Sequence, residues 1–204
     1  DMIEVVDGKG TLFACRITLA HSKHCGVEIV ESIEAGTHWG NRIILCVAPT
    51  KNLDRIEWLA EKCTEMGIDR LIPIKCRYSE RKELKTERLQ KILVSAMKQS
   101  LKAVLPQLDE MTPVAEVINM PFEGQKYIAY CDDAVDRRLL AKEYKPGEDV
   151  MILIGPEGDF SKEEVDAALN NGFVPVSLGE SRLRTETAAV SACFACHTLN
   201  QKSE

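Results

Sequence analysis

From about Asn41 onward, short apolar runs alternate with amphipathic helical patterns. The apolar runs cover residues 43–48, 71–76, 127–131, 150–154 and 174–178. Parallel strands cannot be joined by a tight turn, so each helix between two such runs is read as a crossover connection. The sequence therefore predicts an α/β domain with a mostly parallel sheet over residues 39–204.

The helices are expected where apolar side chains recur at helical spacing. Asp54 is the expected cap of a helix that Gly67 ends, with Glu57 completing a capping box. A longer helix is expected from Thr86, and Ser161 with Glu164 forms a second capping box. Short helices are expected from Thr112-Pro113 and over 136–143, and a final helix, apolar nearly all round, over 186–200.

Residues 1–38 have a β pattern instead. Two strands flank the turn Asp7-Gly8-Lys9-Gly10, and residues 26–33 form a third. Three strands are too few to bury a core alone. We therefore expect part of a small β-barrel, and the start at Asp1 without a methionine suggests that an N-terminal segment precedes this sequence.

Composition narrows the class of partner and compartment. The net charge of −6 argues against a uniformly basic surface for nucleic acid, but not against a local basic patch. Nine basic residues in the window 75–102 face only three glutamates, which indicates either such a patch or an ordinary solvated helix face. Eight cysteines without framework spacing suit a reducing cytoplasm. No apolar run is long enough to span a membrane.

Two glycine-containing loops follow the last two apolar runs. The first is Gly155-Pro156-Glu157-Gly158, and the second covers residues 179–187. Their spacing of about one βα unit predicts two strand ends side by side, where ligands of parallel sheets bind. The first loop lacks the Gly-Lys-Ser/Thr of a nucleotide-triphosphate loop and the spacing of a dinucleotide fingerprint. Taken singly, a tight turn or an ion pair at a helix start would also explain each loop.

Glu157 restricts the ligand. A carboxylate inside a glycine-rich turn repels phosphate, whereas it suits hydroxyls, amines or a positive centre. A ribose or a sulfonium would fit. Cys193-Phe194-Ala195-Cys196-His197 matches a haem-attachment pattern, but it lies inside a helical pattern, and we reject that interpretation. The other histidines lack metal-ligand spacing with the cysteines, so no metal is expected.

The two loops resemble those of the ribosomal small-subunit methyltransferase E family, the 16S rRNA uridine-N3 methyltransferases of the SPOUT class. The resemblance rests on residues 154–158, on Leu178-Gly179 and on residues 183–188. It extends to Lys62-Cys63-Thr64-Glu65-Met66-Gly67 and to residues 96–100 upstream. It covers essentially the whole sequence. It implies a SPOUT methyltransferase domain over 39–204 with a C-terminal trefoil knot, and a PUA-like RNA-binding barrel of which 1–38 is part. It also implies a homodimer acting on 16S rRNA of the small ribosomal subunit.

The resemblance also implies site residues. S-adenosylmethionine would be held by Ile154, Gly155, Pro156, Glu157, Gly158, Leu178, Gly179, Leu183, Thr187 and Ala188. Many family members have Gly-Gly where this chain has Gly158-Asp159, Pro-Arg where it has Glu180-Ser181, and Arg where it has Lys102. These departures bear on RNA contacts more than on the cofactor.

The expected reaction moves a methyl group from the sulfonium to N3 of a uridine. Arg184 is the residue expected to stabilise the anion or hold the base, and Glu186 is expected to orient Arg184 or act as the base. The residues expected to contact RNA are Arg77, Arg81, Lys82, Lys98, Lys102 and Arg182. Two alternatives remain open: a SPOUT enzyme that methylates the 2′-hydroxyl of a tRNA ribose, and a non-catalytic RNA-binding or ribosome-assembly module.

Overall fold

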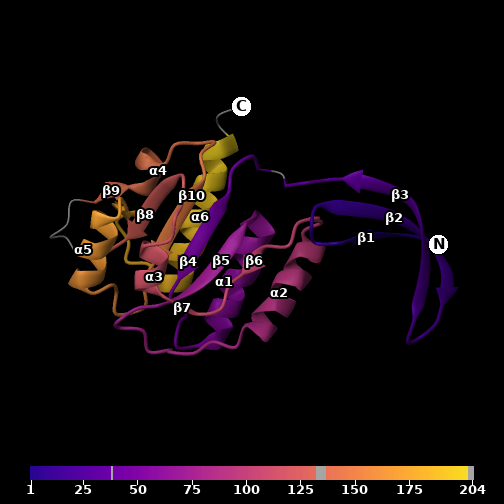
Figure 1. Ribbon diagram of the computed structural model, residues 1–204, viewed down its shortest axis with the longest axis horizontal. Coiled ribbons are helices and arrows are strands. Elements are labelled where there is room, and N and C mark those ends of the chain that lie inside the picture. Colours follow the sequence, from indigo (N-terminus) through magenta and orange to yellow (C-terminus); the bar gives the residue numbers. More distant parts are fainter. Residues whose placement is uncertain (38, 132–136, 202–204) are drawn as a thin grey trace.

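The computed structural model describes residues 1–37, 39–131 and 137–201. In these residues one eight-stranded sheet has the order β6-β5-β4-β10-β8-β11-β9, with β7 paired to β5 off this path (Figure 1). All of its strand pairs are parallel, which confirms the predicted α/β class. The strands are β4 (Ile43–Val47), β5 (Arg70–Lys75), β6 (Gln107–Leu108), β7 (Thr112–Pro113), β8 (Gln125–Ala129), β9 (Arg138–Leu139), β10 (Val150–Ile154) and β11 (Val174–Ser177).

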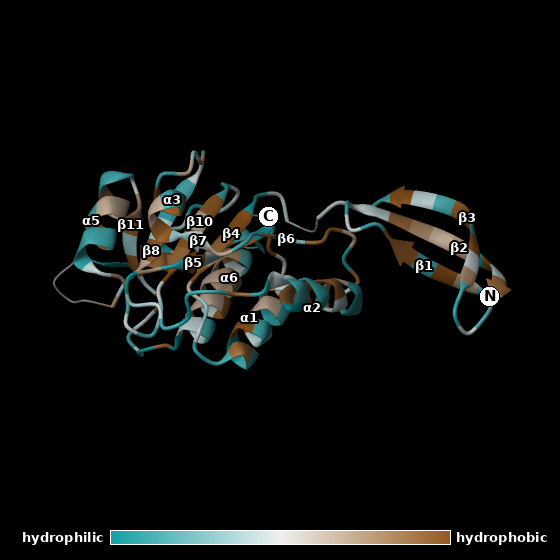
Figure 2. Ribbon diagram, turned by 60° about the horizontal axis from the view of Figure 1, so that its bottom comes forward, coloured by the Kyte–Doolittle hydropathy of each residue, from teal (hydrophilic) through white to brown (hydrophobic). Residues whose placement is uncertain are grey.

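Helices cover both faces of this sheet. The alternation of side chains along β4 shows how: Ile43 and Leu45 belong to one buried cluster, while Ile44 belongs to the other. Figure 2 shows the apolar central strands flanked by helices that carry both polar and apolar residues. The first cluster is closed by α1 (Leu53–Met66), α2 (Thr86–Gln99), α4 (Leu140–Glu143) and α6 (Thr185–Gln201), and the second by α3 (Val114–Ile118) and α5 (Lys162–Asn170).

The capping residues in the sequence predicted some helix ends correctly and others wrongly. The capping box of Ser161 and Glu164 is present at the start of α5, and Gly67 ends α1, as predicted. The predicted cap at Asp54 is wrong. Asn52 caps α1, with its side-chain oxygen accepting the Asp54 N–H at 3.0 Å, because either residue type caps a helix well.

Two predicted short helices are partly strands. Thr112 and Pro113 form β7, paired with the end of β5, and α3 begins one residue later. In the predicted helix 136–143, Asp136 lies outside the described residues, and Arg138–Leu139 pairs with β11 as strand β9. Only Leu140–Glu143 is helical. Pairing with distant strands outweighed the weak local helical pattern in both places.

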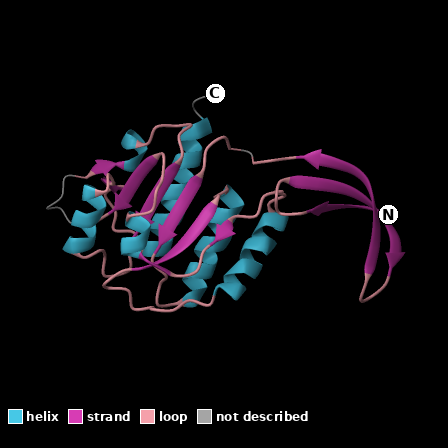
Figure 3. Cartoon of the chain, in the orientation of Figure 1, coloured by secondary structure: helices cyan, strands magenta, loops and turns pink. Residues whose placement is uncertain are grey.

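The N-terminal strands form a separate antiparallel sheet that extends away from the α/β body (Figures 1 and 3). It contains β1 (Met2–Val6), β2 (Thr11–Ala20) and β3 (Cys25–Glu34), so the predicted hairpin and third strand are confirmed. The hairpin turn contacts the body: the Gly10 N–H donates to Ala103 and the Leu105 N–H donates to Gly8. The expected boundary at residue 38 lies outside the described residues.

No helix in the described residues is both long and apolar enough to cross a membrane.

Candidate functional site

A cleft of about 1350 Å³ opens at the carboxyl ends of β10, β8 and β11. The two glycine-containing loops lie on either side of it, but the prediction that their strands are adjacent is wrong. Strand β8 lies between β10 and β11, and its end at 129–131 lines the floor of the cleft. Inserting one strand separates the loops by two strand spacings, roughly 10 Å, and makes room for a ligand between them.

The first loop is a tight turn held from inside. The Asp159 N–H donates to the Pro156 carbonyl at 2.9 Å. Gly155 lies against the Phe160 ring, where an added Cβ would be 3.0 Å from a ring carbon. The small residue is therefore needed for the loop to turn over the ring. Residues 154–158, all predicted to bind the cofactor, line the cleft.

The second loop joins the first through one buried hydrogen bond. The Thr185 hydroxyl, at the start of α6, donates to the Gly155 carbonyl at 3.0 Å. This bond fixes the start of α6 against the end of β10. Of the residues predicted in this segment, Leu178, Gly179, Leu183 and Ala188 line the cleft, and Thr187 is not among its lining residues.

The two residues predicted to be catalytic lie in different surroundings. Arg184 is exposed and lines the cleft. Glu186 is buried and is not among the residues that line the cleft, and its carboxylate pairs with Arg55 of α1 at 3.6 Å. Its Oε2 atom is buried without a hydrogen-bond partner. A buried carboxylate oxygen is costly to leave unpaired.

Asp159 was noted in the sequence only as a departure from Gly-Gly. Its backbone is in the left-handed region, with φ of 62°, where Asp is one of the few non-glycine residues tolerated. One carboxylate oxygen accepts the Phe160 N–H at 2.8 Å and the other accepts the Cys131 N–H at 3.0 Å. Asp159 thereby ties the end of β8 to the first loop. Burial raises the pKa of this carboxyl above its usual value.

The residues predicted to contact RNA lie in different surroundings. Arg77 and Lys82 are exposed on the loop after β5, Lys98 is exposed in the last turn of α2, and Arg182 lines the cleft. Arg81 is half-buried. Sequence patterns could not separate these surroundings, because charge density along the chain carries no information on which way a side chain points.

Lys102 is the clearest departure from the expected RNA contacts. It is only 9% exposed, and its ammonium donates to the Glu65 carbonyl at 2.5 Å. Burial lowers the pKa of this ammonium below the ordinary lysine value. Because its charged end is turned inward onto α1, the structure does not support Lys102 as a phosphate contact.

We expect Lys102→Met to lower the free energy of unfolding by about 1 kcal/mol, because the Glu65 carbonyl loses its donor. Its affinity for 16S rRNA, the partner that the sequence resemblance implies, should stay within about twofold of the parent's. Lys98→Met, the matched exposed change, should leave stability unaltered and reduce the salt dependence of RNA binding by about one counterion. Thermal unfolding and salt-dependent RNA titrations measure both. Weaker RNA binding by Lys102→Met at unchanged stability would contradict this assignment.

No group of three or more His, Cys, Asp or Glu side chains is placed to hold a metal ion in the described ranges.

Comparison with known proteins first defines the class. Residues 37–197 match the family model described as the RNA methyltransferase domain. The matched range runs from the segment before β4 into α6, so it includes the parallel sheet and both loops of the cleft. An RNA methyltransferase domain is the class that this fold and cleft define.

Individual relatives narrow the class to one family. The ribosomal RNA small subunit methyltransferase E of Aquifex aeolicus is 30% identical over 196 residues, which are 90% of this chain and 80% of that protein. The crystal structure of a probable rRNA-methyltransferase from Porphyromonas gingivalis has 46% identity and a TM-score of 0.95, over 100% of this chain and 87% of that one. The chain belongs to the ribosomal RNA small subunit methyltransferase E family, which confirms the resemblance found in the sequence.

One relative has been solved with its cofactor bound. The structure of the same-named enzyme from Neisseria gonorrhoeae is bound to S-adenosyl methionine. It is 27% identical to this chain with a TM-score of 0.87, over 98% of this chain and 83% of that one.

Proposed function

We propose that this protein transfers a methyl group from S-adenosylmethionine to N3 of a uridine in 16S rRNA of the small ribosomal subunit. The observation that carries the proposal is the cleft between the two glycine-containing loops, in a chain of this family. At about 1350 Å³ it exceeds the usual range of roughly 300–1,000 Å³ for small-molecule sites. It has room for a cofactor and a flipped base together.

The residues present fit S-adenosylmethionine. The tight first loop and the open Gly179 of the second, with φ of 133°, let backbone groups approach a ligand closely. Glu157 is exposed at the cleft and supplies negative charge for hydroxyls or a cation. We propose that 154–158, Leu178, Gly179, Leu183 and Ala188 line the cofactor. When bound, S-adenosylmethionine supplies an electrophilic methyl group on its sulfonium.

Arg184 and Glu186 are proposed to act on the uridine. N3 must lose its proton before its lone pair can attack, so the ring becomes negative as the reaction proceeds. Arg184 at the cleft wall stabilises that charge. Glu186, whose Oε2 is unpaired, is the proposed proton acceptor, although in this structure it does not line the cleft. Its carboxylate pairs with Arg55 rather than with Arg184, which argues against the role of orienting Arg184.

The protein is proposed to act as a homodimer through α6. Phe194 on this helix is 60% exposed, and its neighbours Val190 and Ala195 are only half-buried. A helix apolar nearly all round needs cover on this outer face. A second copy would provide it and bring two clefts into one assembly.

Two inherited features complete the proposal. The chain from β8 to α6 would form the trefoil knot of SPOUT enzymes. The position of β8 between β10 and β11 and the bond from Thr185 to Gly155 support this. The N-terminal sheet would belong to a PUA-like barrel that helps to hold RNA in the cytoplasm, where ribosomes assemble. Ile29, Val30 and Ile33 of β3 are exposed, and further strands of a barrel would bury such apolar side chains.

The deciding experiment offers methyl-labelled S-adenosylmethionine with small-subunit RNA or assembled subunits that lack the modification. The RNA is then digested to nucleosides for mass spectrometry. We expect label in 3-methyluridine. Label on a ribose 2′-oxygen would replace the proposal with the ribose-methylating alternative. Absence of both label and cofactor binding would favour a non-catalytic assembly module.

A further inference from the structure

The loop of residues 76–85, between β5 and α2, covers the loops that follow β4 and β10. These three strands are neighbours in the sheet, so their carboxyl ends lie at the same edge. The Arg77 N–H donates to the Glu164 carboxylate at 2.8 Å. A Cβ added at Gly158 would lie 3.0 Å from the Tyr78 Cβ. The loop is therefore packed directly behind the proposed cofactor turn.

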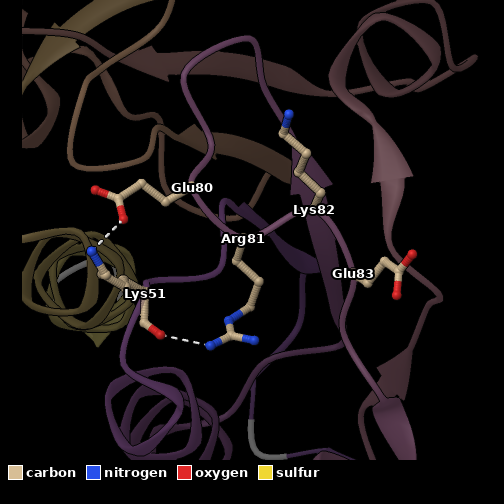
Figure 4. Close-up of a pocket in the computed structure, with 5 residues that line it drawn as sticks. All are labelled: Lys51, Glu80, Arg81, Lys82 and Glu83. Atoms are coloured by element: carbon tan, nitrogen blue, oxygen red, sulfur yellow. Dashed lines mark hydrogen bonds and ion pairs between the residues drawn. The ribbon is translucent and has the colours of Figure 1, made fainter.

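The guanidinium of Arg81 donates hydrogen bonds to backbone carbonyls, so these donors are not available to an RNA phosphate. Its Nε donates to the Thr50 carbonyl at 3.1 Å and its Nη2 to the Lys51 carbonyl at 2.6 Å. Figure 4 shows the guanidinium directed at the Lys51 backbone, while the neighbouring Lys82 points away. A planar fork of this kind holds two acceptors in a fixed relative orientation.

The same backbone segment contacts the proposed cofactor loop. The Lys51 N–H donates to Glu157 Oε1 at 3.2 Å. This N–H and the Thr50 carbonyl belong to one planar trans peptide group, so they point in opposite directions. Holding the carbonyl with Arg81 therefore aims the N–H at Glu157. The Lys51 ammonium is occupied separately by Glu80 at 2.9 Å.

The cavity beside Arg81 does not itself suit an RNA phosphate. It measures about 390 Å³ and is lined by Lys51, Arg81 and Lys82 together with Glu80 and Glu83. Two of the cations are already paired, and the two carboxylates oppose an anion. The charge arrangement favours a structural role for Arg81 over the RNA contact expected from the sequence.

We propose that Arg81 is a positioning residue of the cofactor site, which holds the turn after β4 so that its peptide group orients the Glu157 carboxylate toward the ligand. Arg81 acts through the backbone of Thr50 and Lys51 and does not touch the cofactor. This inference rests on the proposed function, because it assigns Glu157 to S-adenosylmethionine.

The test measures affinity for S-adenosylhomocysteine, the non-reactive product, by calorimetry on the full chain. Arg81→Lys keeps the charge but loses the fork, and we expect its dissociation constant to rise about tenfold, as for loss of one hydrogen bond to a charged group. Lys82→Ala is the matched control from the same loop and should change this constant less than about twofold. Affinity of Arg81→Lys for RNA should be unchanged, since the charge remains.

A double-mutant cycle separates positioning from general damage. If Arg81 acts through Glu157, adding Arg81→Lys to Glu157→Ala should change the dissociation constant less than about twofold. A full tenfold effect in that background would overturn the proposal. So would an unchanged cofactor affinity in Arg81→Lys, or equal losses of RNA affinity in Arg81→Ala and Lys82→Ala. A parent protein that fails to bind S-adenosylhomocysteine would instead refute the proposed function itself.

Discussion

Replacing Arg184 with alanine is expected to lower the single-turnover rate of methyl transfer by about 10²- to 10³-fold. The guanidinium lies on the wall of the cleft. In the proposed reaction the uridine would become negative there as N3 loses its proton. Removing a cation that stabilises negative charge in the transition state slows the methyl-transfer step itself. Affinity for S-adenosylhomocysteine should change less than about threefold, because the first loop, which is the proposed cofactor site, is untouched.

Two further variants sharpen this prediction. Arg184→Lys should recover only part of the rate, since an ammonium cannot contact two ring atoms as a planar fork does. Arg138→Ala removes an exposed arginine that pairs with Glu143 and does not line the cleft. Its rate should match the parent's. A parent-like rate in Arg184→Ala at saturating RNA would remove Arg184 from the mechanism.

Gly67→Ala is expected to produce the largest loss of stability, about 3 kcal/mol, seen as a fall of roughly 6–12 °C in the thermal midpoint. Gly67 ends α1 with φ of 117°, which alanine adopts only with strain. An added Cβ would lie 2.4 Å from the Trp39 ring. The ring cannot simply move away, because its Nε1 donates to Asp69 at 2.9 Å and its edge meets His197.

Gly147→Ala separates the two causes. Gly147 also has a positive φ, of 81°, but nothing lies within 4 Å of an added Cβ. Its loss should therefore reflect backbone strain alone, about 1 kcal/mol. Circular dichroism melts of both variants measure the difference. Equal losses would show that the contact with Trp39 contributes nothing.

The sequence was most informative where a signal is local. The Ser161–Glu164 capping box and the end of α1 at Gly67 follow from groups within four positions of each other. The alternation of Ile43, Ile44 and Leu45 between two layers follows from strand geometry. The two glycine-containing loops were likewise placed correctly at strand ends, because turn chemistry is read from a few consecutive residues.

Side-chain partners were not readable in the same way. Arg81 and Lys102 look like the other cations of the 75–102 window in sequence, yet one holds a distant backbone turn and the other is buried on α1. Glu186 pairs with Arg55 of another helix. Nothing within a few residues of these side chains specifies such partners.

By itself, then, the sequence determined a parallel α/β body, an antiparallel N-terminal hairpin and two glycine-containing loops at strand ends, because periodicity, capping and turn chemistry act over a few residues. Only the tertiary structure decided that β8 lies between β10 and β11, and that Lys51 meets Glu157, 106 positions away. Strand order and such pairings depend on how buried surfaces from the whole chain pack together. That global packing is what places the two loops across one cleft.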